Sequence, residues 1–208
     1  MTKQKTPTKI LADLQAGNER FLNGESVQSS HLSLLKLKDF AKTGQFPKAI
    51  VLCCSDSRAP VEMIFDQDIG DLFVIRVAGN VVAPSLVGSV EFAVSTFDTN
   101  LVLVMGHTQC GAIQATIDHI CDSQKLSSAN IFDIVSRIRP HVLPITKMHK
   151  LSESDRLEMA VEANVRASVN QLAHSSRLIE GMVQQGKIKI IGAILNLETG
   201  KVDFLETI

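Results

Sequence analysis

Two short blocks of the sequence, residues 54–58 and residues 106–111, contain the side chains best suited to chemistry. They supply two thiols and one imidazole, from Cys54, Cys110 and His107. Ligands of these types bind Zn²⁺, and a set of three leaves the fourth tetrahedral position open to water or substrate, as in catalytic zinc sites. The sequence therefore predicts one Zn²⁺ per chain with an open coordination position.

A charged pair, Asp56 and Arg58, follows the first of these ligands. In an exposed loop such an ion pair contributes little to stability. Next to a metal, Arg58 would keep Asp56 ionised and hold its carboxylate away from the open position. Asp56 could then accept a hydrogen bond from the water species at that position and fix its orientation. We therefore predict catalytic roles for Asp56 and Arg58.

The two remaining cysteines lack such a setting. A single cysteine is most often a small buried apolar residue. Cys53 precedes Cys54 on a predicted strand, so its side chain points to the opposite face and is expected in the core. Cys121 lies near a predicted helix end without a partner motif and is expected to be a structural or exposed thiol.

Composition narrows the class of protein. The chain has 208 residues, 45% of them hydrophobic, and a formal net charge of −1. One α/β domain fits this length, and the charge gives no sign of binding to nucleic acid or to an anionic membrane. Its apolar runs are shorter than the roughly 20 residues that cross a bilayer, and the N-terminus lacks a stretch of signal-peptide type. These features predict a cytoplasmic protein. Because that compartment is reducing, the four cysteines are not expected to form a disulfide framework.

Apolar runs alternate with amphipathic segments along the whole chain. We expect strands over residues 48–54, 72–77, 101–105, 187–196 and 202–206, and helices over 8–22, 32–43, 86–97, 111–120, 129–139 and 152–181. This alternation predicts an α/β fold with a mostly parallel sheet and helices on both faces. Ser85 is expected to cap its helix, Pro140 to close another, and Gly106 to end the third strand.

The expected strands place the candidate ligands. Cys54 ends the first strand, and His107 and Cys110 follow the third, so all three lie past the carboxyl ends of strands, where open α/β sheets bind ligands. If these two strands are neighbours, the three side chains converge. The thiol of Cys110 would also lie by the positive end of the helix that begins near Gly111, which favours the thiolate.

The combination C-x-D-x-R and G-H-x-x-C-G strongly resembles the β-class carbonic anhydrases. The resemblance runs through residues 47–112 and, more weakly, through 162–172 and 190–196. It implies reversible hydration of carbon dioxide to bicarbonate and a proton. It also implies that Cys54, His107 and Cys110 hold the zinc, that Asp56 and Arg58 form the catalytic dyad, and that Gln45, Phe73, Ala78, Phe92 and Gly111 line the substrate pocket.

The same resemblance implies an architecture. A central parallel sheet with an antiparallel edge strand would form residues 45–208, and residues 1–44 would be a helical arm that clasps a partner, within one domain over residues 1–208. The apolar residues Ile10, Leu11 and Leu14 would serve that contact. The unit would be a homodimer or homotetramer, with Gln45, Phe73 and Phe92 across a subunit boundary from the zinc that they serve.

Some positions depart from the resembled pattern. Phe92 stands where Tyr is frequent, and Val77 where Asn is common. A second subgroup has an inhibitory bicarbonate site that needs a Trp and a Gly, and Val51 and Cys53 hold those two positions here. Arg76 alone is not expected to form that site, so the sequence predicts no such regulation.

Two alternatives remain beside carbonic anhydrase. Similar zinc scaffolds can present hydroxide to other linear molecules, so hydrolysis of carbonyl sulfide or carbon disulfide is one. The other is a zinc-stabilised binding protein or thiol-redox protein without turnover. The pair Asp56 and Arg58 argues against this second alternative, because a closed structural zinc site has no need of it.

Overall fold

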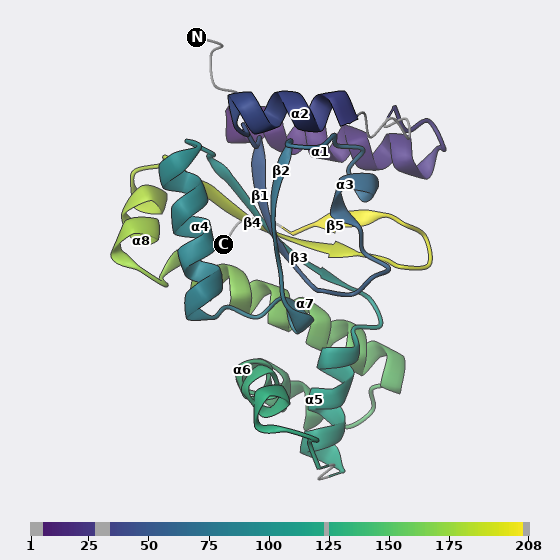
Figure 1. Cartoon of the computed structure of the whole chain (residues 1–208). Helices are drawn as coiled ribbons and strands as arrows, with labels where there is room; N and C mark the ends of the chain where they lie inside the picture. Colours follow the sequence, from purple (N-terminus) through teal and green to yellow (C-terminus); the bar gives the residue numbers. More distant parts are fainter. Residues whose placement is uncertain (1–5, 28–33, 123–124, 206–208) are drawn as a thin grey trace.

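The chain folds around one five-stranded sheet with the strand order β2-β1-β3-β4-β5 (Figure 1). The computed structural model describes residues 6–27, 34–122 and 125–205. The strands are β1 (Ala49–Cys53), β2 (Leu72–Arg76), β3 (Leu101–His107), β4 (Lys189–Leu195) and β5 (Val202–Phe204). The helices are α1 (Pro7–Leu22), α2 (Leu34–Thr43), α3 (Val61–Ile64), α4 (Pro84–Thr96), α5 (Gly111–Cys121), α6 (Ala129–Thr146), α7 (Glu153–Ala173) and α8 (Arg177–Gln184), with a 3-10 turn η1 (Ala78–Asn80).

The sheet is parallel except at one edge. β1 pairs with β2 and with β3, β3 pairs with β4, and all these pairs are parallel, whereas β5 is antiparallel to β4. All seven residues of β3 are buried, as expected for a central strand that is covered on both faces. The predicted fold class, a mostly parallel sheet with an antiparallel edge strand, is confirmed.

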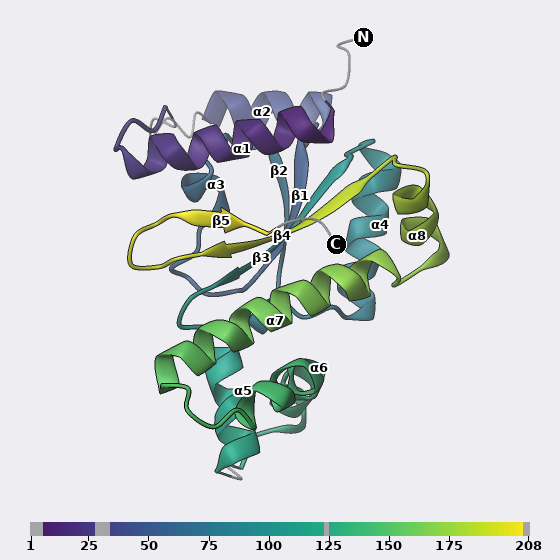
Figure 2. The same ribbon diagram turned by 180° about the vertical axis from the view of Figure 1, so that it is seen from behind.

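Alternate residues of the strands contact different helices. Val51, Cys53 and Leu103 pack in one cluster with α1 and α3, whereas Leu52 and Val104 pack in another with α4, α7 and α8. This is the alternation that the pleat of a strand imposes. Figure 1 places α1 and α2 at one end of the molecule and α5 and α6 at the other. In Figure 2, α7 lies between these two ends.

Helix α1 belongs to the core of its own chain. Ile10 and Leu14 are buried in the cluster that lies against β1 and β3, and Leu11 packs against that cluster. The side chain of Asn18 fastens the helix: its Nδ2 donates to the carbonyls of Ile64 and Gly200, and its Oδ1 accepts from the N–H of Val202. The expectation that the apolar residues of α1 form a free face for a partner is therefore wrong.

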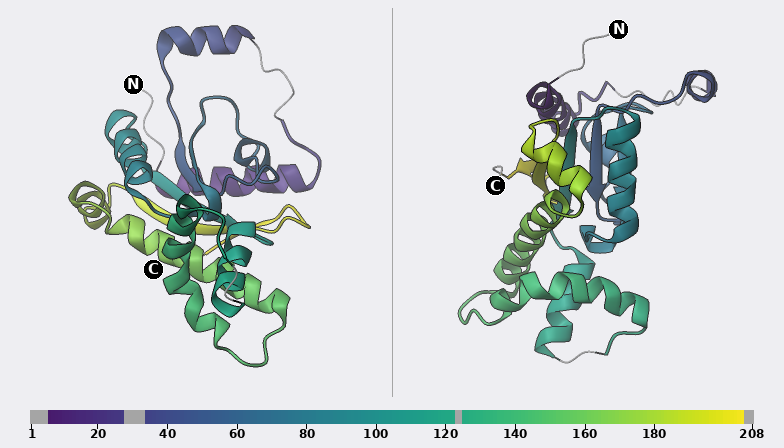
Figure 3. Two further views of the ribbon diagram at one scale, coloured as in Figure 1. Left: turned by 60° about the horizontal axis from the view of Figure 1, so that its bottom comes forward. Right: turned by 90° about the vertical axis from the view of Figure 1, so that its left-hand side faces the viewer.

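Helix α2 is much less attached. Both views of Figure 3 show it standing apart from the sheet and from the other helices. Phe40 contacts Gly70, and Lys36 pairs with Asp68, while Leu37 is exposed. The predicted stop at Gly44 is confirmed, since Gly44 has a φ of +83°, which glycine adopts without strain. The predicted start at residue 32 lies outside the described residues.

Two predicted element ends, at Ser85 and Gly106, differ from the structure. β3 does not stop at Gly106, because Gly106 and His107 continue the pairing with Ile194 and Leu195. Ser85 does not cap α4: the N-cap is Ala83 without a side-chain bond, and a proline occupies the first turn, where its missing N–H costs nothing.

The later helices also end elsewhere than predicted. α6 continues past Pro140 to Thr146, because a buried row of residues packs on both sides of the proline: Val135, Ile138, Val142 and Ile145. The predicted helix over 152–181 is two helices, since α7 ends at Ala173 and the Ser176 side chain caps α8 by accepting from the N–H of Ile179. Among the described residues, no helix is long and apolar enough to cross a membrane.

Candidate metal centre

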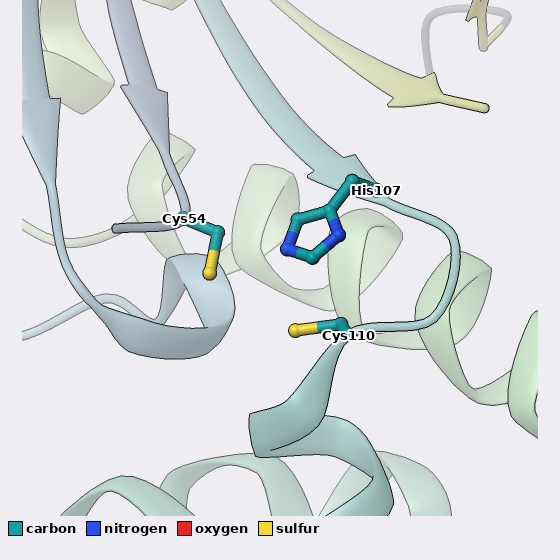
Figure 4. Close-up of side chains that lie close together, drawn as sticks. All are labelled: Cys54, His107 and Cys110. Atoms are coloured by element: carbon teal, nitrogen blue, oxygen red, sulfur yellow. The ribbon is translucent and has the colours of Figure 1, made fainter. Parts of the chain in front are cut away.

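The predicted ligands converge at the carboxyl edge of the sheet. Cys54 directly follows β1, His107 is the last residue of β3, and Cys110 is the N-cap of α5. Because β1 and β3 are parallel neighbours, the three side chains meet. Their ligand atoms all lie within 4.8 Å of one another, and Figure 4 shows the two sulfur atoms and the imidazole pointing toward a common centre.

The imidazole of His107 is set up as a metal ligand. Its Nδ1 lies 2.9 Å from the carbonyl oxygen of Thr108. A carbonyl only accepts, so Nδ1 carries the proton and Nε2 keeps its lone pair. Nε2 is buried and has no hydrogen-bond partner among the described residues. A buried nitrogen of this kind is costly unless something binds it, and a cation at the centre of the three ligands would do so.

The two thiols complete a zinc-type donor set. Cys54 and Cys110 share a hydrogen bond that lowers the pKa of Cys54 below the ordinary thiol value and raises the pKa of Cys110. The N–H of Gly79 also donates to the Cys54 sulfur over 3.4 Å. Without a metal the pair therefore retains one proton, and a divalent cation would displace it. Two sulfurs and one neutral imidazole fit Zn²⁺.

Asp56 and Arg58 lie together beside these ligands. Nε of Arg58 donates to Oδ1 of Asp56 over 3.0 Å, Nη2 donates to Oδ2 over 2.8 Å, and the backbone N–H of Arg58 donates to Oδ1 over 2.9 Å. These bonds hold the pKa of Asp56 well below its usual range. Oδ2 lies 3.7 Å from Nε2 of His107, so an ionised carboxylate borders the metal position while Arg58 occupies both of its oxygens.

Comparisons with known proteins agree with this geometry. The family model for carbonic anhydrase matches residues 49–202. Carbonic anhydrase 2 of Mycobacterium tuberculosis is 35% identical over 195 residues, which cover 94% of this chain and 91% of that protein. The chain belongs to the β-class carbonic anhydrases.

Solved structures of this class have the same fold. The structure of the β-carbonic anhydrase CcaA superposes with a TM-score of 0.73 at 26% identity, covering 94% of this chain and 98% of that one. Tetrameric β-carbonic anhydrases from the ascomycete Sordaria macrospora superpose with a TM-score of 0.70 at 20% identity, covering 95% and 97%. None of these comparisons supports either alternative, a carbonyl sulfide or carbon disulfide hydrolase or a non-catalytic zinc or thiol protein.

In this β-class carbonic anhydrase, Arg76 holds the loop that follows β1 and contains Cys54 and Asp56. Its Nε donates to the carbonyl of Cys54 over 3.0 Å, and its Nη2 donates to the carbonyl of Asp56. From the sequence, Arg76 is a candidate only for a bicarbonate site, and its role in bracing this loop is not predicted. A signal was present, because an arginine at the carboxyl end of β2 lies next to the loop that follows β1.

The loop that joins His107 to Cys110 is fixed by the hairpin between β4 and β5, a contact that the sequence does not predict. The Thr108 N–H donates to the carbonyl of Leu195 over 2.9 Å, and the Thr108 hydroxyl accepts from the N–H of Leu197 over 3.0 Å. Gln109 adopts a left-handed φ of 55°, and its amide donates to Glu198 over 3.0 Å. These contacts hold the carbonyl that orients the His107 ring.

The other two cysteines lie as predicted. Cys53 is fully buried in the core cluster on the α1 side of the sheet. Burial raises the pKa of its thiol to about 12, so it stays protonated and does not act as a ligand. Cys121 is exposed at the end of α5.

The predicted pocket residues divide into two groups. Ala78 precedes Gly79, and Gly111 follows Cys110, so both lie at the metal edge; an added Cβ at Gly111 would meet no atom within 4 Å. Phe73 and Phe92 instead pack together, with ring centroids 6.3 Å apart. Gln45 is exposed in the segment before β1, at the opposite edge of the sheet. One chain therefore does not bring these last three residues to its own metal centre.

Proposed function

We propose that this chain catalyses the reversible hydration of carbon dioxide to bicarbonate and a proton, with one Zn²⁺ held by Cys54, His107 and Cys110. The single observation that carries the proposal is the buried Nε2 of His107, which has no hydrogen-bond partner in the described part of the chain and faces two thiols beside an ionised Asp56. When bound, Zn²⁺ supplies Lewis acidity that makes water a nucleophile near neutral pH.

The residues of the chain orient the reacting water. Asp56 is ionised and its Oδ2 borders the metal position, so this oxygen accepts a hydrogen bond from the attacking water and directs a lone pair of that water toward the carbon of the substrate. Arg58 keeps the carboxylate in this place because it donates to both oxygens. We propose that Asp56 would otherwise turn toward the metal and close the open position.

We further propose a homodimer, or a homotetramer built from two dimers, as the active unit. Gln45, Phe73 and Phe92 would line the pocket of a partner's zinc, because they lie away from the metal centre of their own chain. Phe46 and Phe92 are 71% and 54% exposed, and α2 stands apart from the core, so α2 rather than α1 would clasp the partner. The structural relatives from Sordaria macrospora are described as tetrameric.

A stopped-flow assay of carbon dioxide hydration on the zinc-loaded protein tests the activity. We expect rapid acidification that disappears when a chelator removes the metal. A zinc-replete protein that does not accelerate hydration would contradict the proposal. Sedimentation tests the assembly, since a fully active monomer would exclude the shared pocket. We propose the cytoplasm as the location, because the centre needs two reduced thiols.

A further inference from the structure

The turn η1 holds an unusual backbone beside the metal centre. Gly79 has a φ of +69° and Asn80 a φ of +44°, both left-handed. A Cβ at Gly79 would lie 2.8 Å from Cδ1 of Ile138 and 3.1 Å from Cβ of Ala112, so a side chain there would displace Ile138 and strain the left-handed backbone. This turn presents the N–H of Gly79 to the sulfur of Cys54.

Two buried side chains of α7 hold the turn. Nδ2 of Asn164 donates to the carbonyl of Gly79 over 2.8 Å, and Oγ of Ser168 donates to the carbonyl of Asn80 over 3.1 Å. Asn164 and Ser168 are each only 2% exposed. The peptide group that joins Gly79 to Asn80 is also bonded at its other end, where the N–H of Asn80 donates to the carbonyl of Val77. The plane of this peptide group is therefore fixed from both sides, and it anchors Gly79, whose own N–H belongs to the preceding peptide group.

The arrangement has a cost in folding free energy. Asn80 is a left-handed residue other than glycine, and its buried Nδ2 has no hydrogen-bond partner among the described residues. Strain and buried unpaired donors of this kind persist where a site needs the geometry. In this turn the backbone N–H of Gly79 points at the sulfur of the ligand Cys54.

We propose that Asn164 is a positioning residue of the metal centre: by holding the Gly79 carbonyl it fixes the backbone rotation at Gly79, keeps the N–H of the same residue on Cys54 Sγ, and so weakens the electron donation of that sulfur to the metal. Hydrogen bonds to ligand atoms tune a bound metal in this way. The effect matters here because two thiolates donate strongly and reduce the Lewis acidity of the ion. The inference rests on the proposed metal centre and adds a residue that acts through Gly79.

Substitution of Co²⁺ for Zn²⁺ gives a direct readout, because the wavelength of the sulfur-to-cobalt charge-transfer band reports how strongly the thiolates donate. In Asn164→Leu the band should move to longer wavelength, since the Gly79 N–H is no longer held on the sulfur. Ser168→Ala should cause a smaller shift in the same direction.

Asn170→Leu is the matched control, because Asn170 is an exposed asparagine on the same helix and should leave the band in place. Circular dichroism verifies that each variant is folded. If Asn164→Leu does not fold, Asn164→Ser, whose hydroxyl is too short to reach the Gly79 carbonyl, replaces it in the same measurement.

The outcomes separate this inference from the proposals that precede it. An unmoved band in a folded, cobalt-replete Asn164 variant would overturn the inference alone, and so would an equal shift in Asn170→Leu. A wild-type protein without any sulfur-to-cobalt band would overturn the metal centre and the inference together. A normal band and the expected shift, in a protein that does not hydrate carbon dioxide, would overturn only the proposed activity.

Discussion

The substitution Asp56→Asn should leave zinc in place and remove most of the hydration activity. Arg58 donates to both carboxylate oxygens of Asp56, with Nε and the backbone N–H on Oδ1 and Nη2 on Oδ2. An amide has one oxygen, so one of its ends must set an N–H₂ group against an arginine donor. The acceptor that borders the metal position then becomes a donor or turns away from it.

The size of the loss follows from the role of the carboxylate. Groups that accept or transfer a proton in the transition state contribute roughly 10²- to 10⁴-fold to rate, so kcat/KM for hydration should fall by about that factor. Zinc content should not change, because none of the ligand atoms belongs to Asp56. The assay is stopped-flow hydration at matched zinc occupancy.

A second aspartate provides the control for this prediction. Asp133 makes a similar two-oxygen pair with Arg137, over 3.0 and 3.1 Å, on the exposed surface of α6. Asp133→Asn loses the same kind of ion pair away from the metal and should keep full activity. Near-normal hydration by zinc-replete Asp56→Asn, or an equal loss in Asp133→Asn, would refute the reasoning.

Three further predictions concern stability, thiol reactivity and regulation. Asn18→Leu should lower the free energy of unfolding by about 3 kcal/mol, because it removes the partner of a buried carbonyl, a buried N–H and a partly buried carbonyl. Thermal melts should show a large drop in Asn18→Leu and little change in Asn23→Leu, at an exposed position. Iodoacetamide at pH 8 should modify exposed Cys121 and spare Cys53, whose buried thiol has a pKa of about 12; mass mapping that finds Cys53 modified in folded protein would contradict its burial. Bicarbonate should inhibit without cooperativity at every pH, because the guanidinium of Arg76 is bonded to two carbonyls; a steep sigmoidal loss of activity at lower pH would show that a regulatory site exists.

The sequence alone was sufficient to predict the metal ligands. Cys54 directly follows β1 and His107 ends β3, and a parallel sheet brings the carboxyl ends of such neighbouring strands to one edge. Cys110 is three residues after His107, so a short turn places both. Asp56 and Arg58 are two residues apart, and the geometry of their pair is local. The five predicted strands are confirmed in position for the same reason, since a buried strand shows itself as an apolar run. β3 nevertheless continues past its predicted end at Met105 to His107, and residue 206 of the last predicted strand lies outside the described residues.

Contacts between segments that are distant in sequence could not be predicted in this way. The apolar pattern of α1 shows that Ile10 and Leu14 are buried, but it does not show which surface covers them. In the structure the sheet of the same chain covers them. Pro140 normally breaks a helix, and only the packing of α6 against α5 and α7 allows the helix to continue. Thr108 and Asn164 act through backbone groups of other segments, which periodicity does not reveal.

Zinc content after exhaustive dialysis tests the central claim most directly, with wild-type protein compared with Cys110→Ser and Cys53→Ser. Both substitutions replace a buried thiol by a hydroxyl, but Cys110 lies at the carboxyl edge of the sheet, whereas Cys53 lies in the core cluster on the α1 side. We predict one zinc per chain in the wild type and in Cys53→Ser, and most of the zinc lost in Cys110→Ser. Full zinc in Cys110→Ser with loss in Cys53→Ser would contradict the assignment of the metal centre.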